Sequence, residues 1–224
     1  MKDRLMNPAT DPARLRRGKW TLPALALALA LGACALPGPA VRTTVIYDFG
    51  PGPLASAAPS TANRLPALVL DLMETSPALD STAVLYRLAY VDSQQIHPYA
   101  LARWSMAPAQ LVRQRLRQHL GQRRPLLSPG DQGEAGAPAP VLLQLELEEF
   151  SQLFESASKS SGLLRLHATL TRPGPKGAKW LAQRSLSVQR EAPSADAAGG
   201  VQALTAATDA AALELERWLQ ELGL

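Results

Sequence analysis

The sequence predicts an α+β fold: a compact single domain with two main helices packed on a mixed, largely antiparallel sheet. Three segments in its second half alternate apolar and polar residues with a period of two, as strands with one buried face do. Two other segments carry apolar residues at helical spacing. The 191 residues from 34 to 224 are a suitable length for one domain.

Three strands are expected in the first half. β-branched and aromatic residues predict a strand at 43–49, and apolar runs predict two more at 65–72 and 83–88. Residues 51–64 are rich in Pro, Ala and Ser and are expected to form an exposed loop, and polar residues 92–95 a turn.

The first helix is expected after Ser105, which can cap it, with Pro108 in the first turn and Gly121 just past the end. Its apolar stripe is Leu111, Val112, Leu116 and Leu120. The arginines of this helix and its exit are predicted to be solvated; the alternative is a patch for acidic lipid headgroups or a partner. They are Arg113, Arg115, Arg117, Arg123 and Arg124.

A short strand at 124–127 and a loop at 128–140 precede the three alternating strands, which predict an antiparallel meander. The apolar residues of those strands are Leu143, Leu145 and Leu147; Leu164, Leu166, Ala168 and Leu170; and Leu186 and Val188. A long helix ends the chain, with the stripe Val201, Leu204, Thr208, Ala211, Leu215, Trp218 and Leu222. Small residues in its first half favour packing on the sheet over an intermolecular coiled coil.

No catalytic constellation stands out, and the sequence predicts no enzyme activity, no cofactor and no metal site. The three histidines lack metal-ligand spacing. The carboxylates of Glu146 and Glu148 alternate with leucines, which is typical of a solvated sheet face.

The N-terminus has the features of a secretory signal peptide: basic residues, an apolar run and the sequence Leu31-Gly32-Ala33-Cys34. Cys34 is the only cysteine, and the segment resembles a bacterial lipobox, which implies cleavage before Cys34 and lipidation of its sulfur. We therefore expect a signal peptide at 1–33, a tether at 34–42 and a domain at 43–224. By bacterial sorting rules, the absence of aspartate after Cys34 favours the outer membrane.

Removal of the signal peptide abolishes the positive net charge. Residues 1–33 hold six of the 23 Lys and Arg and two of the 19 Asp and Glu, so seventeen of each sign remain. A neutral chain without a broad basic stripe does not suit nucleic-acid binding.

A partner-binding surface is predicted where tyrosine and arginine cluster, because both are enriched at binding hot spots. Its residues are Tyr86, Arg87, Tyr99 and Arg103. The alternative is that the tyrosines belong to the core and Arg103 covers them. Trp104 is expected to be a core anchor.

The order of these segments resembles the ABC-type transport auxiliary lipoproteins, the family that includes the outer-membrane lipoprotein of the paraquat-inducible MCE system. The resemblance rests on the opening 47–51, the segment 83–87, the stretch 99–108 running into a Leu-rich helix, the strand 143–150 and the Ala-rich helix ending at Arg217-Trp218-Leu219.

This resemblance implies a non-enzymatic accessory subunit at the outer membrane that binds the MCE-domain protein of an ABC lipid transporter, with homo-oligomers possible. The alternatives are a lipid-anchored periplasmic enzyme and a structural envelope lipoprotein.

Overall fold

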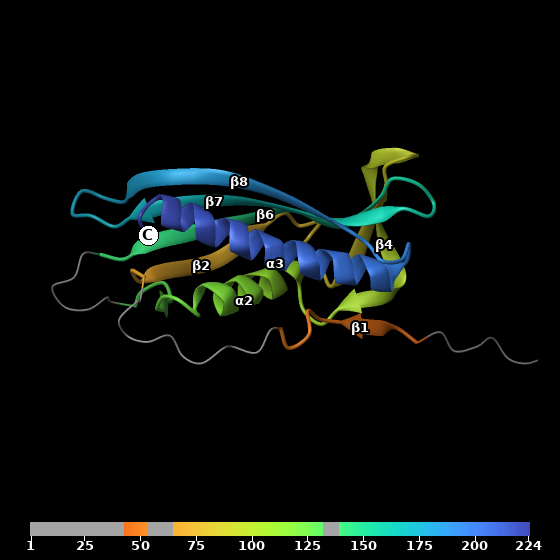
Figure 1. Ribbon diagram of the computed structural model, residues 1–224, viewed down its shortest axis with the longest axis horizontal. Coiled ribbons are helices and arrows are strands. Elements are labelled where there is room, and N and C mark those ends of the chain that lie inside the picture. The colour runs from red at the N-terminus through yellow and green to blue at the C-terminus, as the bar shows by residue number, and fades with distance from the viewer. Residues whose placement is uncertain (1–42, 53–64, 132–138) are drawn as a thin grey trace, which may run out of the picture. The chain divides into compact units, whose positions relative to one another are not determined.

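The computed structural model in Figure 1 describes residues 43–52, 65–131 and 139–224, and these belong to one compact unit. Its elements are β1 (Val45–Tyr47), β2 (Leu68–Thr75), β3 (Ala83–Leu88), β4 (Asp92–Trp104), α2 (Pro108–Leu120), β5 (Leu126–Leu127), β6 (Val141–Phe154), β7 (Ser160–Arg172), β8 (Lys179–Glu191) and α3 (Ala197–Glu221). The predicted α+β class is confirmed: the described strands form one mixed sheet of eight, with two helices.

β6 is the spine of the sheet. One edge pairs along its length with β7 in antiparallel register, and β8 continues this meander. The other edge is shared by two parallel partners: β2 pairs with the first half of β6, and β3 with its last three residues. β5 extends the sheet beyond β2, and β4 and then β1 extend it beyond β3. Residues far apart in sequence thus meet at the two ends of β6.

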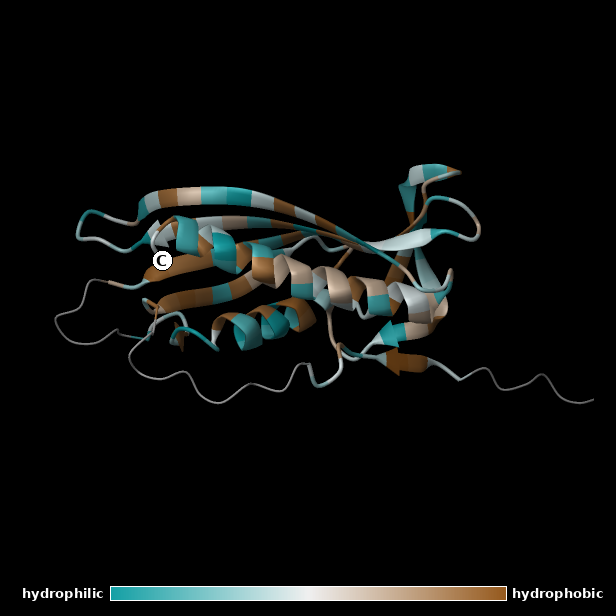
Figure 2. Cartoon of the chain, viewed as in Figure 1, coloured by the Kyte–Doolittle hydropathy of each residue, from teal (hydrophilic) through white to brown (hydrophobic). Residues whose placement is uncertain are grey.

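The apolar face of the meander forms the core with the helices. The leucines of β6 and β7 predicted to face inward are buried, as are Leu186 and Val188 of β8. Gln144, Glu146 and Glu148 between them are exposed. Figure 2 shows the same pattern as brown and teal segments that follow one another along β8.

α3 packs on the sheet of its own domain, against β6, β7 and β8. Its predicted stripe is buried except for Leu222, which is 44% exposed. Gly162 of β7 permits the close approach, because a Cβ atom there would lie 2.5 Å from the Leu204 backbone nitrogen. The Asp196 side chain caps the helix by accepting the Gly199 N–H at 2.8 Å.

Several local predictions are wrong in detail. Ser105 does not cap α2; Ala107 is the N-cap residue, and its side chain has no atom that could accept a cap hydrogen bond. Ser105 lies two residues before the cap, and its backbone N–H donates to the Tyr47 oxygen of β1. Gly121 follows α2 but has right-handed φ and ψ. The second strand lies three residues later than predicted.

The hairpin turn also differs from the prediction. Residues 92–95 are the start of β4, and the turn is formed by residues 89–91. Polar residues fit there because the side chains of residues 93–95 are exposed to solvent.

Two of the arginines predicted to be solvated are buried. Arg115 is 7% exposed and its Nε donates to Asp209 Oδ1 of α3 at 2.7 Å. Arg124 is 3% exposed and donates to Glu216 Oε1 of α3 at 3.1 Å. A buried charge needs a partner, and α3 brings a carboxylate to each. Both arginines therefore tie α2 and its exit to α3.

Candidate partner-binding surface

The hairpin of β3 and β4 brings together the four residues predicted to contact a partner: Tyr86, Arg87, Tyr99 and Arg103. In Figure 1 this hairpin turns away from the long strands of the meander. All four side chains are half-buried, and each has partners within the domain. Their contacts show how the hairpin is held in place.

The hairpin is strongly irregular. Leu85 opposes Pro98, but Ala83 opposes Arg103, so three extra residues of β4 are accommodated between these pairs. A bulge of this kind bends the strand that carries it. Beyond the bulge, β4 pairs with β1 in parallel register. One strand thus serves both the projecting hairpin and the edge of the sheet.

An aromatic cluster forms the base of the hairpin. The Tyr86 ring centroid lies 4.7 Å from that of Tyr99, 5.3 Å from that of His97 and 5.9 Å from that of Phe154 at the end of β6. These separations are those of favourable aromatic pairs. The two tyrosines therefore join β3, β4 and β6.

A chain of hydrogen bonds fixes Tyr99. Its hydroxyl donates to Gln152 Oε1 at 2.8 Å, and Gln152 Nε2 donates to Ser160 Oγ at 2.8 Å. Gln152 is completely buried, and α3 covers it so closely that a Cβ atom at Gly200 would lie 2.1 Å from Oε1. Burial, with smaller contributions from the nearby Tyr86 and Asp196, raises the pKa of Tyr99, which keeps the donor protonated.

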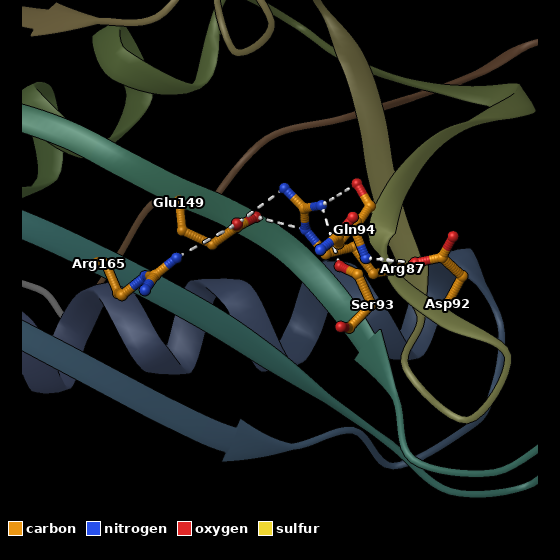
Figure 3. A network of polar contacts seen from close by, with 6 residues as sticks. All are labelled: Arg87, Asp92, Ser93, Gln94, Glu149 and Arg165. Carbon is orange, nitrogen blue, oxygen red and sulfur yellow. Dashed lines mark hydrogen bonds and ion pairs between the residues drawn. The ribbon is translucent and has the colours of Figure 1, made fainter.

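Arg87 holds the hairpin to β6 through Glu149 (Figure 3). Its Nη2 lies 3.0 Å from Glu149 Oε2 and its Nε 3.4 Å from Oε1, while Nη1 donates to the backbone oxygens of Ser93 and Gln94. The Glu149 side chain is only 5% exposed, because the register of β6 and β7 shifts beside it. Arg165 approaches the same carboxylate at 3.8 Å. Arg87 thus compensates a buried charge.

Arg103 stabilises the bulge of β4 by hydrogen bonds to its backbone. Its Nη1 donates to the backbone oxygens of Tyr99 and Ala102. The sequence grouped Arg103 with Arg87, but the structure gives the two arginines different partners: a carboxylate for Arg87 and carbonyls for Arg103.

The side chains that this framework presents to solvent lie beside the four predicted residues. Tyr90 and Val91 form the tip of the hairpin and are 50% and 70% exposed. On the edge strand β1, Ile46 is 69% exposed and is the register partner of Arg103. Their exposure was not predicted from the sequence, although Tyr90-Val91 is an apolar pair that comes almost directly after a predicted strand.

The remaining candidates have ordinary surroundings. His167 Nδ1 lies 3.0 Å from Ser185 Oγ on the neighbouring strand, and His97 is stacked on Tyr86. Within residues 43–52, 65–131 and 139–224, no three His, Cys, Asp or Glu side chains are grouped as metal ligands. No helix in this part of the chain is long and apolar enough to span a bilayer. Cys34 lies outside the described residues.

Solved structures share this fold. A Xanthomonas campestris protein of the DUF330 family aligns with a TM-score of 0.61 and 17% identity, over 78% of this chain and 94% of that one. An uncharacterized protein aligns with a TM-score of 0.56 and 14% identity, over 79% and 99% of the two chains. No curated protein sequence matches the chain.

The family model described as "ABC-type transport auxiliary lipoprotein component" matches residues 47–216. The match extends from β1, through the projecting hairpin and the meander, to most of α3. The chain therefore belongs to the family of ABC-type transport auxiliary lipoprotein components.

Proposed function

We propose that this protein is an outer-membrane lipoprotein subunit of an MCE-type ABC lipid transporter, and that it binds the MCE component in the periplasm. Family membership supports the association with an ABC transport system. In this proposal the chain contributes binding and positioning and catalyses nothing, while the ATPase and the permease are separate chains.

The main support for the proposal is the structure of the β3–β4 hairpin, which has a base fixed by polar contacts and an exposed tip. Buried polar contacts hold its base: Tyr99 to Gln152, and Arg87 to Glu149. Its tip exposes an aromatic and a β-branched side chain, Tyr90 and Val91. Such a rigid support lowers the entropy cost of binding, and tyrosine is a frequent hot-spot residue. We therefore assign the contact to the tip, with Tyr86, Arg87, Tyr99 and Arg103 as the framework and rim of the same surface.

Cys34 supplies the anchor in this account. Stable membrane attachment requires two lipid signals, and the acylated amino group and diacylglyceryl sulfur of a bacterial lipoprotein together provide more than one acyl chain. Nine residues, 34–42, separate the anchor from the domain. A chain of nine residues spans at most about 30 Å, so the tether keeps residue 43, at the start of the domain, within that distance of the membrane.

The test is co-purification from native membranes. The full chain, affinity-tagged, is extracted in mild detergent, and its partners are identified by mass spectrometry. The proposal expects an MCE-domain protein, with the ATPase and permease at lower yield, and expects Tyr90→Asp/Val91→Asp to lose them. Recovery of the chain without an MCE-domain protein after chemical cross-linking would contradict the proposal.

A further inference from the structure

A groove lies between α2 and the edge of β2, away from the hairpin. Its volume is about 590 Å³, within the roughly 300–1,000 Å³ typical of ligand sites. Its lining includes the apolar residues Leu72, Met73 and Met106 and the basic residues Arg113 and Arg117.

A bulge in β2 shapes the apolar part. Leu70 pairs with Leu143 and Met73 with Leu145, so one extra residue of β2 is accommodated between these pairs. The bulge leaves Leu72 71% exposed at the groove. Methionine side chains adapt to ligands of varied shape, and Met73 and Met106 are partly buried against the core here. An exposed leucine in the same groove as two methionines is a favourable surface for an alkyl chain.

The two arginines differ from three other arginines that are buried or half-buried. Arg87, Arg115 and Arg124 each have a carboxylate partner. No ion pair among the described residues includes Arg113 or Arg117, although both are half-buried.

Backbone carbonyls orient these two arginines. Arg113 donates to the backbone oxygens of Asp71 and Leu70, at 2.8 and 3.3 Å, and Arg117 to that of Leu126 at 3.4 Å. The carbonyls fix the guanidinium groups without neutralising them. The positive charge at the groove is therefore available to an external anion.

Arg113 donates to the carbonyl of Asp71, the residue before Leu72, so the charge is separated along the groove from Met106 rather than from Leu72. Arg113 and Arg117 lie one turn apart on α2, while Met106 precedes the start of the helix. The helix rises about 13 Å between Pro108 and Arg117. The Asp80 carboxylate also lines the groove and would repel an anion placed beside it. The charge distribution therefore favours a ligand with its anionic group at the arginines and its alkyl chain toward Met106.

We propose that this groove binds a single-chain anionic amphiphile, with its carboxylate or phosphate on Arg113 and Arg117 and its alkyl chain on Leu72, Met73 and Met106. The site needs no partner protein. Its test therefore does not depend on whether the chain binds an MCE component.

The experiment uses the full chain in membrane vesicles and a matched pair of probes. One is a long-chain fatty acid with a diazirine in its alkyl chain and an alkyne tag; the other is the fatty alcohol of the same chain. After photolysis, cross-linked residues are located by mass spectrometry. We expect the acid to label the peptides carrying Leu72, Met73 and Met106 about tenfold more than the alcohol, since hydrogen bonds to charged groups contribute at least that factor.

Variants separate head recognition from tail recognition. Arg113→Gln/Arg117→Gln should reduce labelling by the acid to the level of the alcohol, and Leu72→Glu should reduce labelling by both probes. Arg117→Gln alone is the second variant if the loss of Arg113 unfolds the edge of β2. Arg172→Gln and Leu213→Glu change an exposed arginine and an exposed leucine outside the groove and should have no effect.

Three results would overturn the assignment. The first is equal labelling by acid and alcohol. The second is label spread over the surface, which would indicate contact with the bilayer. The third is complete competition by inorganic phosphate at the fatty acid's own concentration, which would show a simple anion site.

Discussion

The Tyr99 hydroxyl donates a 2.8 Å hydrogen bond to the buried Oε1 of Gln152, and this bond joins the projecting hairpin to the spine of the sheet. Gln152 Nε2 in turn donates a hydrogen bond to Ser160 Oγ of β7, and the Gln152 side chain lies against Gly200 of α3. The hairpin is thus connected to three elements of the core through one buried amide.

Removal of the Tyr99 hydroxyl should destabilise the domain. Tyr99→Phe keeps the ring but leaves Gln152 Oε1 without its donor, and an unsatisfied buried acceptor costs about 1–3 kcal/mol. Chemical denaturation of the wild type and the variant measures this difference in unfolding free energy. Tyr90→Phe is the control. The Tyr90 side chain is exposed, so loss of its hydroxyl should change the unfolding free energy by less than about 0.5 kcal/mol. Equal effects of the two substitutions would contradict the role of Gln152.

The same hydroxyl predicts a pH dependence. The pKa of Tyr99 is raised above 10.0 in the folded state, so the folded protein holds this proton more tightly than the unfolded chain. The contribution of the Tyr99 hydroxyl to the unfolding free energy is fully present below about pH 10. It decreases as the pH rises further, because the unfolded chain then loses this proton before the folded protein does. The gap in unfolding free energy between wild type and Tyr99→Phe should therefore narrow above pH 10. A gap that stays constant or widens there would contradict this sign.

Arg87 should matter for stability more than Arg165, although both approach Glu149. Arg87→Gln leaves a nearly buried carboxylate, and we expect a cost at the lower end of the roughly 3–5 kcal/mol found for buried pairs, because Arg87 is itself 20% exposed. Arg165 is 50% exposed and 3.8 Å away, so Arg165→Gln should cost less than about 1 kcal/mol. Thermal melts of both variants and of Arg87→Gln/Glu149→Gln measure these effects. The double variant should recover part of the loss; no recovery would contradict the ion pair as its cause.

Packing of α3 on its own sheet predicts a matched pair of leucine variants. Leu215 is completely buried, so Leu215→Ala should cost about 2–5 kcal/mol. Leu213 is two residues away and 55% exposed, so Leu213→Ala should change the unfolding free energy by less than about 0.5 kcal/mol. The melting temperatures should not depend on protein concentration. A strong dependence would indicate that α3 has an intermolecular role.

Periodicity made the meander and α3 predictable. Leu143, Leu145 and Leu147 alternate without interruption, and α3 carries its stripe over six turns. Both patterns give an apolar face that must be buried, and the small residues in the first half of α3 favoured the sheet over a second helix. The local errors lie where contacts with other elements determine the structure. They are the turn at 89–91, the N-cap of α2, and the burial of Arg115 and Arg124.

The candidate surface was only partly predictable for the same reason. Tyr86 and Tyr99 cluster in sequence, but their half-burial depends on Phe154 and Gln152, more than fifty residues later. Arg87 meets Glu149 at a place where the register of β3 and β4 and that of β6 and β7 both shift. Sequence spacing cannot encode such shifts. The pattern therefore singled out residues of this hairpin but did not identify Tyr90 and Val91 as its exposed side chains.

Replacement of Cys34 tests the anchor. Cys34→Ala removes the sulfur that would carry the lipid, so the protein should appear in the soluble periplasm or remain an uncleaved precursor. Fractionation of cells with immunodetection distinguishes these forms from a membrane-bound protein, which is the form expected for the wild type. A Cys34→Ala protein that is processed normally and still sediments with the outer membrane would contradict the anchor.

The affinity of the full chain for its MCE-domain partner, with and without the hairpin tip, tests the central proposal most directly. Tyr90→Asp/Val91→Asp changes two exposed side chains, so its melting temperature should match the wild type, while its Kd should rise at least about tenfold, as expected for hot-spot residues. Leu213→Asp, an exposed leucine on α3, is the matched control and should bind as the wild type does. An unchanged Kd for the folded tip variant would contradict the hairpin as the binding surface, and the absence of wild-type binding would contradict the proposed function.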